Sequence, residues 1–420
     1  MLAATKLRYL ASFKVPARFF SVSPWSKSPF PIADPIFELQ EQFNADKDPR
    51  KLILGIGAYR DDNGKPCVLP SIREAERRIT GKCDHEYSTL AGIPEFNDLA
   101  AKYAFGADCK PLKQNRIATC QAISGSGALR LLAQLFVDED YCKEIYLPKP
   151  TWANHNVIFE KTGIKCKSYR YLNPDRPVLN YEGILEDIDL APEGSTFFFH
   201  ACAHNPTGVD PSHKQWDQIS KHIRDKNHRV IFDAAYLGYA SGSIDNDAYS
   251  IRKFVDDGHY LALCLSFSKN FGLYGERVGC TSIVCEDYDE KKKVLEQLKC
   301  AARSLWSLSP LYGARLVSEI LRDPKLYKQW EGECRQMSER IKSMRYLLVD
   351  NLAKCGSAKD WSHITNQIGM FSFTGLSPEQ IDRLREQYHV YILRNGRASV
   401  SGINTHNVEY IAKAMHEVTK

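Results

Sequence analysis

The run Tyr260-Leu-Ala-Leu-Cys-Leu-Ser-Phe-Ser-Lys-Asn-Phe-Gly272 places a lysine, Lys269, directly after an unbroken apolar stretch. A short continuous apolar run that ends in serine and glycine is typical of a strand covered on both faces of a sheet. A lysine at the end of a strand is most often only a surface charge. A special role for Lys269 therefore depends on what the neighbouring strands contribute.

Short β-rich runs alternate with helical patterns from about residue 117 to residue 285. The expected strands are Glu144–Leu147, Thr196–His200, Val230–Asp233, Leu261–Ser266 and Gly279–Val284. The expected helices between them are Gly127–Val137, Asn154–Thr162, Lys214–Asp225 and Ala248–Asp256. This alternation predicts an α/β fold in which parallel β-α-β units bury a sheet between helices.

The C-terminal part of the chain has a different pattern. A long amphipathic helix is expected from Asp323 to Leu352, followed by isolated strands at Gly369–Phe373 and Val390–Leu393 and a closing helix at Asn407–Val418. A chain of 420 residues is also too long for one small core. We therefore expect a large domain at residues 66–335 and a smaller α+β domain at 336–420, with an N-terminal arm at 21–65 that forms part of the small domain.

The first thirty residues hold five basic side chains and no acidic one, and the first acid is Asp34. This composition is typical of a mitochondrial transit peptide, which we expect at residues 1–20 with cleavage between Phe20 and Ser21. A basic tail without a targeting role is the alternative. Removal of residues 1–20 lowers the formal charge from +5 to +1, so no basic field for nucleic acid remains. The expected location is the mitochondrial matrix.

The remaining composition excludes several other classes of protein. No apolar run approaches the roughly 20 residues of a membrane helix. The 13 cysteines are irregularly spaced and include no Cys-x-x-Cys pair. In the reducing matrix, they are expected to be free thiols with no disulfide framework and no zinc or other metal site.

Candidate partners for Lys269 lie at the C-terminal ends of the neighbouring strands. Asp233 ends the run that starts at Arg229, Tyr236 follows it, and Asn205 follows the strand that ends at His200. Open α/β sheets bind ligands at this edge, although the Asn205 run would also make an ordinary turn. A carboxylate suits a pyridine nitrogen, and a phenol and an amide suit a phenolic oxygen. With a lysine, they form the set that a pyridoxal-phosphate (PLP) Schiff base needs.

An anion site is the remaining requirement for this cofactor. Ser124-Gly-Ser-Gly127 opens an expected helix, where glycines and free N–H groups favour a phosphate dianion. Arg277 and Ser266 lie close to Lys269 in the sequence and would add donors. Each signal alone is weak, because helix starts are often rich in serine and glycine and a lone arginine is most often at the surface.

Six segments agree in order with one known family. They are Leu54-Gly-Ile-Gly-Ala-Tyr-Arg-Asp-Asp-Asn-Gly-Lys-Pro66, Ser124-Gly-Ser-Gly-Ala-Leu-Arg130, Pro150-Thr-Trp-Ala-Asn-His155, His200-Ala-Cys-Ala-His-Asn-Pro-Thr-Gly208, Phe232-Asp-Ala-Ala-Tyr236 and Ser266-Phe-Ser-Lys-Asn-Phe-Gly-Leu-Tyr274. From about Asp34 to the C-terminus the chain resembles the aspartate aminotransferases, and its N-terminal extension resembles that of the mitochondrial members.

The resemblance implies a PLP-dependent transferase of fold type I, with a mainly parallel seven-stranded sheet between helices and a smaller α+β domain. It also implies a homodimer with active sites at the subunit interface. Lys269 would carry the cofactor and shuttle the substrate α-proton. The implied cofactor contacts are Asp233 to the pyridine nitrogen, Asn205 and Tyr236 to the phenolic oxygen, Trp152 stacked on the ring, Ser124, Gly125, Ser126, Ser266 and Arg277 to the phosphate, and Tyr87 to the phosphate of the neighbouring subunit.

The same resemblance implies ping-pong amino transfer between L-aspartate and 2-oxoglutarate, giving oxaloacetate and L-glutamate. Arg397 would bind the α-carboxylate, and Arg303 would reach the side-chain carboxylate from the partner subunit, with Gly57, Trp152 and Asn205 also at the substrate. Two guanidinium groups suit a dicarboxylate, because each can bind one carboxylate by a pair of hydrogen bonds.

The loop after Arg303 departs from the family pattern. The family usually has Pro-x-Tyr-Ser-Asn-Pro-Pro, and this chain has Ser304-Leu-Trp-Ser-Leu-Ser-Pro310. Ser126 replaces a commoner threonine, and Leu237 a commoner glutamine. The loss of two prolines predicts a looser loop, and with it two alternatives. The enzyme could accept aromatic amino acids or kynurenine, or the chain could be a catalytically quiet paralogue, against which the complete cofactor set argues.

Overall fold

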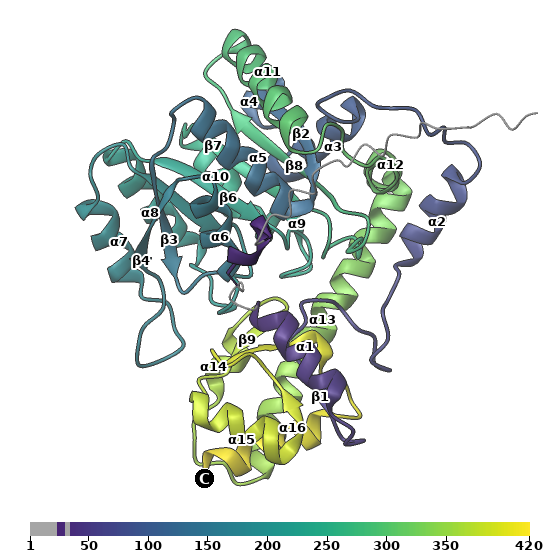
Figure 1. Cartoon of the computed structure of the whole chain (residues 1–420), viewed down its shortest axis with the longest axis vertical. Helices are drawn as coiled ribbons and strands as arrows, with labels where there is room; N and C mark the ends of the chain where they lie inside the picture. Colours follow the sequence, from purple (N-terminus) through teal and green to yellow (C-terminus); the bar gives the residue numbers. More distant parts are fainter. Residues whose placement is uncertain (1–22, 30–33) are drawn as a thin grey trace, which may run out of the picture.

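The structure is a computed structural model that describes residues 23–29 and 34–420. The expected transit peptide and its cleavage site lie outside the described residues. A large sheet with helices on both faces forms one part of the molecule, and a smaller group of helices and short strands lies below it (Figure 1). The long helix α13 (Pro324–Lys354) runs from the first part into the second.

The large sheet has seven strands in the order β2-β8-β7-β6-β5-β3-β4. Their bounds are β2 Ile117–Ile123, β3 Glu144–Lys149, β4 Lys165–Arg170, β5 Thr196–His200, β6 Arg229–Ala234, β7 Leu261–Ser266 and β8 Val278–Val284. The pairs formed by β3 to β7 are parallel, and β8 is antiparallel to both of its neighbours. The predicted mainly parallel seven-stranded sheet is therefore confirmed.

Side chains along each central strand alternate between two apolar cores. In β5, Phe197 and Phe199 face one core and Phe198 faces the other; in β6, Phe232 and Ile231 divide in the same way. Because successive side chains point to opposite faces, a strand covered on both sides must be apolar throughout. This explains the unbroken apolar runs in the sequence.

Helices cover both faces of the sheet. One face packs against α5 (Ser124–Asp138), α6 (Ala153–Lys161) and α11 (Tyr288–Leu305). The other packs against α3 (Pro94–Phe105), α7 (Tyr181–Leu190), α8 (His213–Asp225) and α10 (Tyr249–Asp256). The helices α2 (Pro70–Ile79) and α12 (Tyr312–Arg322) pack beside α13, and α4 (Lys110–Lys113) and α9 (Ile244–Asp247) are single turns.

The smaller group is built from both ends of the chain. The N-terminal strand β1 (Leu52–Ile53) pairs with β10 (Val390–Tyr391), and β9 (Phe371–Phe373) pairs with β11 (Arg397–Ser399). The helices of this group are α1 (Pro35–Ala45), α14 (Ser362–Asn366), α15 (Pro378–Tyr388) and α16 (Val408–Thr419), and single 3₁₀ turns lie at Pro24–Lys27 and Val400–Gly402. Within the described residues, no helix is long and apolar enough to cross a membrane.

Candidate active site

Lys269 lies in the turn directly after β7, enclosed by groups from distant parts of the sequence. Its Nζ atom donates a hydrogen bond to the carbonyl oxygen of Gly57 and lies 4.8 Å from the centre of the Tyr274 ring. Burial, together with the nearby charges of Arg397 and Arg277, lowers the pKa of this amine to about 8. A substantial fraction of Lys269 is therefore neutral, and able to act as a nucleophile or base, just above neutral pH.

Asp233, at the end of β6, is held by a buried chain of polar side chains. Its Oδ2 lies 3.1 Å from Nε2 of His155, whose Nδ1 lies 2.8 Å from Oγ1 of Thr151. The same hydroxyl lies 3.2 Å from Nε2 of His200, and His200 Nδ1 accepts the N–H of Asn205 at 3.3 Å. Burial keeps the pKa of His200 well below its ordinary value. This chain fixes the orientation of the Asp233 carboxylate at the edge of the sheet.

The start of α5 lies close to the turn that holds the lysine, since the Ser124 and Ser268 hydroxyls are 2.7 Å apart. Its first residue, Ser124, adopts φ +59°, and Gly125 packs against the Ser266 side chain so closely that a Cβ would lie 3.2 Å from the Ser266 Cβ. Arg277 donates from Nη2 to Ser126 Oγ at 3.3 Å and from Nη1 to the Tyr274 carbonyl at 3.1 Å. Backbone N–H groups, serine hydroxyls and the Arg277 guanidinium therefore lie close together at the start of α5, and all of these are donors suited to an anion.

Arg397 is the third cation at this site, and it is the first residue of β11 in the smaller group of helices and short strands. Only 3% of it is exposed. Its guanidinium donates to Asn205 Oδ1 at 3.2 Å and to the Gly55 carbonyl at 2.8 Å, and lies 4.1 Å from the centre of the Phe371 ring. Burial lowers its pKa to about 10, and its Nε atom has no hydrogen-bond partner among the residues that the structure describes. A buried guanidinium without a carboxylate partner is suited to bind one from a ligand.

The remaining predicted side chains show different degrees of enclosure. Tyr236 is buried, and burial raises the pKa of its hydroxyl. Trp152 caps the start of α6 and packs edge to face on His155, with ring centres 5.2 Å apart. Tyr87 and Arg303 are exposed, and in this single chain Arg303 Nη1 donates only to Ser307 Oγ among the described residues. These two side chains do not join the site within one subunit.

Arg303 and Ser304 lie in the last turn of α11, which ends at Leu305, and the altered loop continues from there. Ser304 Oγ donates to the Ala301 carbonyl at 2.8 Å, and the buried Ser309 Oγ donates to the Gln121 carbonyl in β2 at 3.1 Å. We expected a looser loop because two prolines are replaced. The two serines make hydrogen bonds that proline rings could not make, Ser304 within α11 and Ser309 to β2, and the looser loop stays a prediction.

Sequence reasoning missed the polar chain behind Asp233. Thr151, His155 and His200 all lie in segments that carry the family resemblance, but no role was predicted for them. One signal was available: His200 ends the strand next to Asp233, and the register of β5 and β6 pairs these two residues directly. His155 carried no such signal, because its position depends on how α6 packs.

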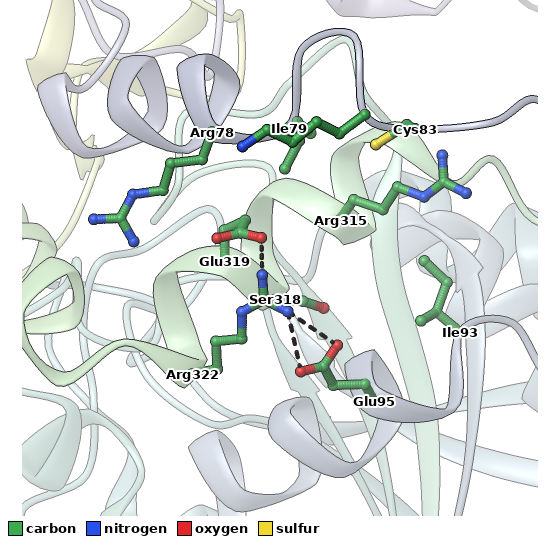
Figure 2. A pocket seen from close by; sticks show the side chains of 10 residues that line it. Arg78, Ile79, Cys83, Ile93, Glu95, Arg315, Ser318, Glu319 and Arg322 are labelled. Atoms are coloured by element: carbon green, nitrogen blue, oxygen red, sulfur yellow. Dashed lines mark hydrogen bonds and ion pairs between the residues drawn. The ribbon is translucent and has the colours of Figure 1, made fainter.

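A separate pocket lies between α2, α3 and α12 (Figure 2). Its volume is about 220 Å³, and Arg78, Arg315 and Arg322 line it. All three arginines are ion-paired, for example Arg78 with Asp323 at 2.7 Å and Arg315 with Asp84 at 2.8 Å. None of the predicted site residues lines this pocket, so it is separate from the candidate active site around Lys269.

A sheet of this topology, with a lysine after β7, an aspartate at the end of β6 and an anion site at the start of α5, defines a PLP-dependent transferase of fold type I. The chain belongs to the aminotransferase class I and II family, whose sequence pattern matches residues 49–415. It is therefore a PLP-dependent aminotransferase.

Three known proteins illustrate the similarity. The mitochondrial aspartate aminotransferase of Dictyostelium discoideum is 54% identical over 388 residues, which cover 92% of this chain and 91% of that protein. The structure of a mitochondrial aspartate aminotransferase from Trypanosoma brucei has a TM-score of 0.89 at 45% identity, covering 91% of this chain and all of that one. An aromatic-amino-acid aminotransferase from Burkholderia pseudomallei, covalently bound to pyridoxal phosphate, has a TM-score of 0.92 at 35% identity, covering 95% and 100%.

Proposed function

We propose that this enzyme is an aspartate aminotransferase, which reversibly transfers the amino group of L-aspartate to 2-oxoglutarate and forms oxaloacetate and L-glutamate. The observation that carries the proposal is the position of Lys269. Burial and the charges of Arg397 and Arg277 lower the pKa of its amine to about 8, and the amine donates a hydrogen bond to the Gly57 carbonyl. The similarity to aspartate aminotransferases along nearly the whole chain supports the choice of substrate.

The residues present fit pyridoxal phosphate. The site contains three cationic side chains, Lys269, Arg277 and Arg397. They lie near the carboxylates of Asp233 and Asp34, so positive charge predominates and favours an anionic ligand. We propose that Asp233 pairs with the pyridine nitrogen, that Asn205 and Tyr236 bind the phenolic oxygen, and that Trp152 covers the ring. The phosphate would be held by the remaining predicted set, Ser124, Gly125, Ser126, Ser266 and Arg277, with Tyr87 of the neighbouring subunit.

The bound cofactor supplies an electron sink that makes the α-proton of the substrate acidic. Lys269 is proposed to move that proton, because its lowered pKa of about 8 makes the neutral amine accessible and its neighbours hold it beside the site. Asp233, fixed by His155, keeps a negative charge where a protonated ring nitrogen is needed. Burial keeps the pKa of His200, further along the same chain, well below its ordinary value, so His200 adds no competing positive charge.

Two arginines divide the recognition of the substrate. Arg397 is proposed to bind the α-carboxylate, for which its unpartnered Nε and its bond to Asn205 prepare it. Arg303 is proposed to bind the side-chain carboxylate across a subunit interface, together with Gly57, Trp152 and Asn205 on the other side. Its exposure in a single chain is consistent with this role.

We propose that the enzyme is a homodimer in the mitochondrial matrix. The exposed Tyr87, 82% of whose surface is open in one chain, and the exposed Arg303 support shared active sites. The acid-free N-terminus supports import. We further propose that residues 66–335 form a large domain and residues 336–420 a small one, with residues 21–65 as an N-terminal arm. Residues 1–20 are proposed to be removed as a transit peptide.

A coupled assay tests this function. Purified protein with added pyridoxal phosphate is expected to turn over aspartate repeatedly only when 2-oxoglutarate is present, because aspartate alone yields no more than one oxaloacetate per active site. Lys269→Ala is expected to abolish turnover. No turnover of aspartate by the cofactor-loaded wild type would contradict the proposal.

A broader specificity for aromatic amino acids is the second candidate. The replacement of the loop asparagine by Leu308 and the similarity to an aromatic-amino-acid aminotransferase favour it. Activity of Arg303→Ala on aspartate and on phenylalanine separates the two. If Arg303 binds the side-chain carboxylate, aspartate turnover falls and phenylalanine turnover does not. Equal losses on both substrates would exclude that role.

A further inference from the structure

Three buried serine hydroxyls meet beneath the start of α5. Ser124 Oγ lies 3.1 Å from Ser266 Oγ and 2.7 Å from Ser268 Oγ. Between 3% and 5% of each residue is exposed. The backbone N–H of Ser268 also donates to Ser266 Oγ, at 3.2 Å. Ser268 is the residue directly before Lys269, and it has no role among the residues assigned above.

The hydrogen-bond capacity of the three hydroxyls restricts where their protons point. Each hydroxyl donates one hydrogen bond and accepts two. Ser266 Oγ already accepts the Ser268 N–H. Ser124 Oγ, at 2.7 Å from Ser268, is the nearest partner of the Ser268 hydroxyl. If Ser268 donates to Ser124, the proton of Ser124 is free to point at an anion in front of α5. If Ser124 donates to Ser268 instead, the Ser124 proton points away from the anion and cannot form a hydrogen bond with it.

We propose that Ser268 is a positioning residue for the phosphate of the cofactor. Its hydroxyl donates to Ser124 Oγ, so the proton of Ser124 turns towards the bound anion, and donors arranged in a chain of this kind polarise one another. Ser268 contacts the anion only through Ser124. It also joins the phosphate site to Lys269, because the two residues are adjacent in one turn.

This inference rests on the proposed cofactor site, and it is tested by binding rather than by turnover. Inorganic phosphate and pyridoxal phosphate are titrated into the cofactor-free, full-length Ser268→Ala variant by calorimetry. The substitution removes the hydroxyl and keeps the backbone N–H. The loss of one donor in the chain is expected to raise both dissociation constants about three- to tenfold. Ser268→Cys, of similar size with a weaker donor, is expected to give a smaller loss.

Ser282→Ala is the matched control. Ser282 is also a buried serine of the large sheet, and its hydroxyl lies 3.0 Å from Thr119 Oγ1, away from the start of α5. Its removal costs a comparable internal hydrogen bond and is expected to leave both dissociation constants unchanged. A loss shared by Ser268→Ala and Ser282→Ala would show a general structural effect and would overturn the proposal.

A double-mutant cycle separates positioning from direct contact. In a Ser124→Ala background, Ser268→Ala is expected to have no further effect on phosphate affinity. Wild-type affinity of the single variant, or an equal loss in both backgrounds, would overturn the proposal while the cofactor site stood. If wild-type protein bound neither inorganic phosphate nor pyridoxal phosphate, the cofactor site itself would be wrong, and the role of Ser268 with it.

Discussion

Lys269 differs from an ordinary lysine in its surroundings, which penalise its charged form. Its pKa in the folded protein is about 8, against an ordinary value of 10.5, chiefly because of burial and then because of two arginines. Protonation therefore costs folding free energy at any pH below about 8, and that cost disappears as the pH rises towards 10.5.

The charge of Lys269 is thus expected to destabilise the cofactor-free protein in a pH-dependent way. Lys269→Met should gain stability relative to wild type below pH 8, by at most about 3 kcal/mol, and should lose that advantage towards pH 10.5. Urea unfolding of both proteins at several pH values measures the difference. A difference that did not change with pH would contradict the buried-charge explanation.

Arg397 provides a second prediction at this scale. Arg397→Lys keeps the positive charge but loses the planar pair of donors that a carboxylate needs. The Michaelis constant for aspartate is expected to rise about 10- to 100-fold, as when a buried, charge-assisted contact is lost. Affinity for pyridoxal phosphate should not change.

The control for this change is Arg394→Lys. Arg394 is an exposed residue in the turn just before β11, and it pairs with Asp382 at 3.1 Å. Steady-state kinetics on both variants are compared, and an equal rise in their Michaelis constants would remove the special role of Arg397.

Individual residues could be predicted where chemistry and strand ends coincide. Asp233 and Asn205 follow recognisable strands, so the edge of the sheet brings them together. The contacts of His155 and Thr151 could not be predicted, because they depend on the packing of α6 on the sheet. Tyr87 and Arg303 remain predictions, since a single chain leaves both exposed.

At the scale of elements, the start of α5 packs directly against Gly279 of β8. A Cβ on Gly279 would lie 2.5 Å from the Leu265 carbonyl oxygen and 2.9 Å from the Ser124 Cα. No side chain fits between the helix start and the two strands. The anion site therefore depends on close contact of three backbones.

Gly279→Ala is expected to push α5 away from β7. Overpacking of this kind typically costs about 1–3 kcal/mol of stability, and the phosphate donors would move with the helix. The dissociation constant for inorganic phosphate should rise at least about tenfold, by the loss of two hydrogen bonds or more. Gly275→Ala is the control, because nothing lies within 4 Å of its added Cβ. Equal phosphate affinities in the two variants would contradict this account of the contact.

Some elements were predicted from their patterns, but others with clear patterns were not, such as the apolar strand β2 and the amphipathic helices α2 and α12. The strands Thr196–His200 and Leu261–Ser266 agree with the structure, and the long helix differs by a few residues at its ends. The edge strand β4 was missed, since its sequence Lys-Cys-Lys-Ser-Tyr-Arg lacks an apolar run. The antiparallel direction of β8 was also missed. It follows from the connection after β7, which contains no helix and so returns the chain in the opposite direction.

At the scale of the whole molecule, the proposed dimer makes a prediction about mixed subunits. In a hybrid of Lys269→Ala and Arg303→Ala subunits, one active site would receive an intact Lys269 from one chain and an intact Arg303 from the other. Random mixing should yield hybrids as half of the dimers. Activity on aspartate should then recover to about a quarter of the wild-type value, although each variant alone is nearly inactive.

Co-expression with two affinity tags, followed by purification of the hybrid, measures this recovery. The purified hybrid has one intact site in two, so its activity should be about half of the wild-type value. No recovery would mean that Arg303 serves its own subunit, and the proposed shared site would be wrong. A hybrid of two Lys269→Ala subunits with different tags is the control for recovery caused by the tags.

The central claim is that Lys269 carries the cofactor in an aspartate-specific site, and the visible absorbance spectrum of the purified protein tests it most directly. The wild-type protein with pyridoxal phosphate is expected to show an absorbance band that shifts when aspartate is added and returns when 2-oxoglutarate follows. After borohydride reduction, mass spectrometry should find the cofactor on Lys269. A band that aspartate does not change, or a cofactor trapped on another lysine, would contradict the account.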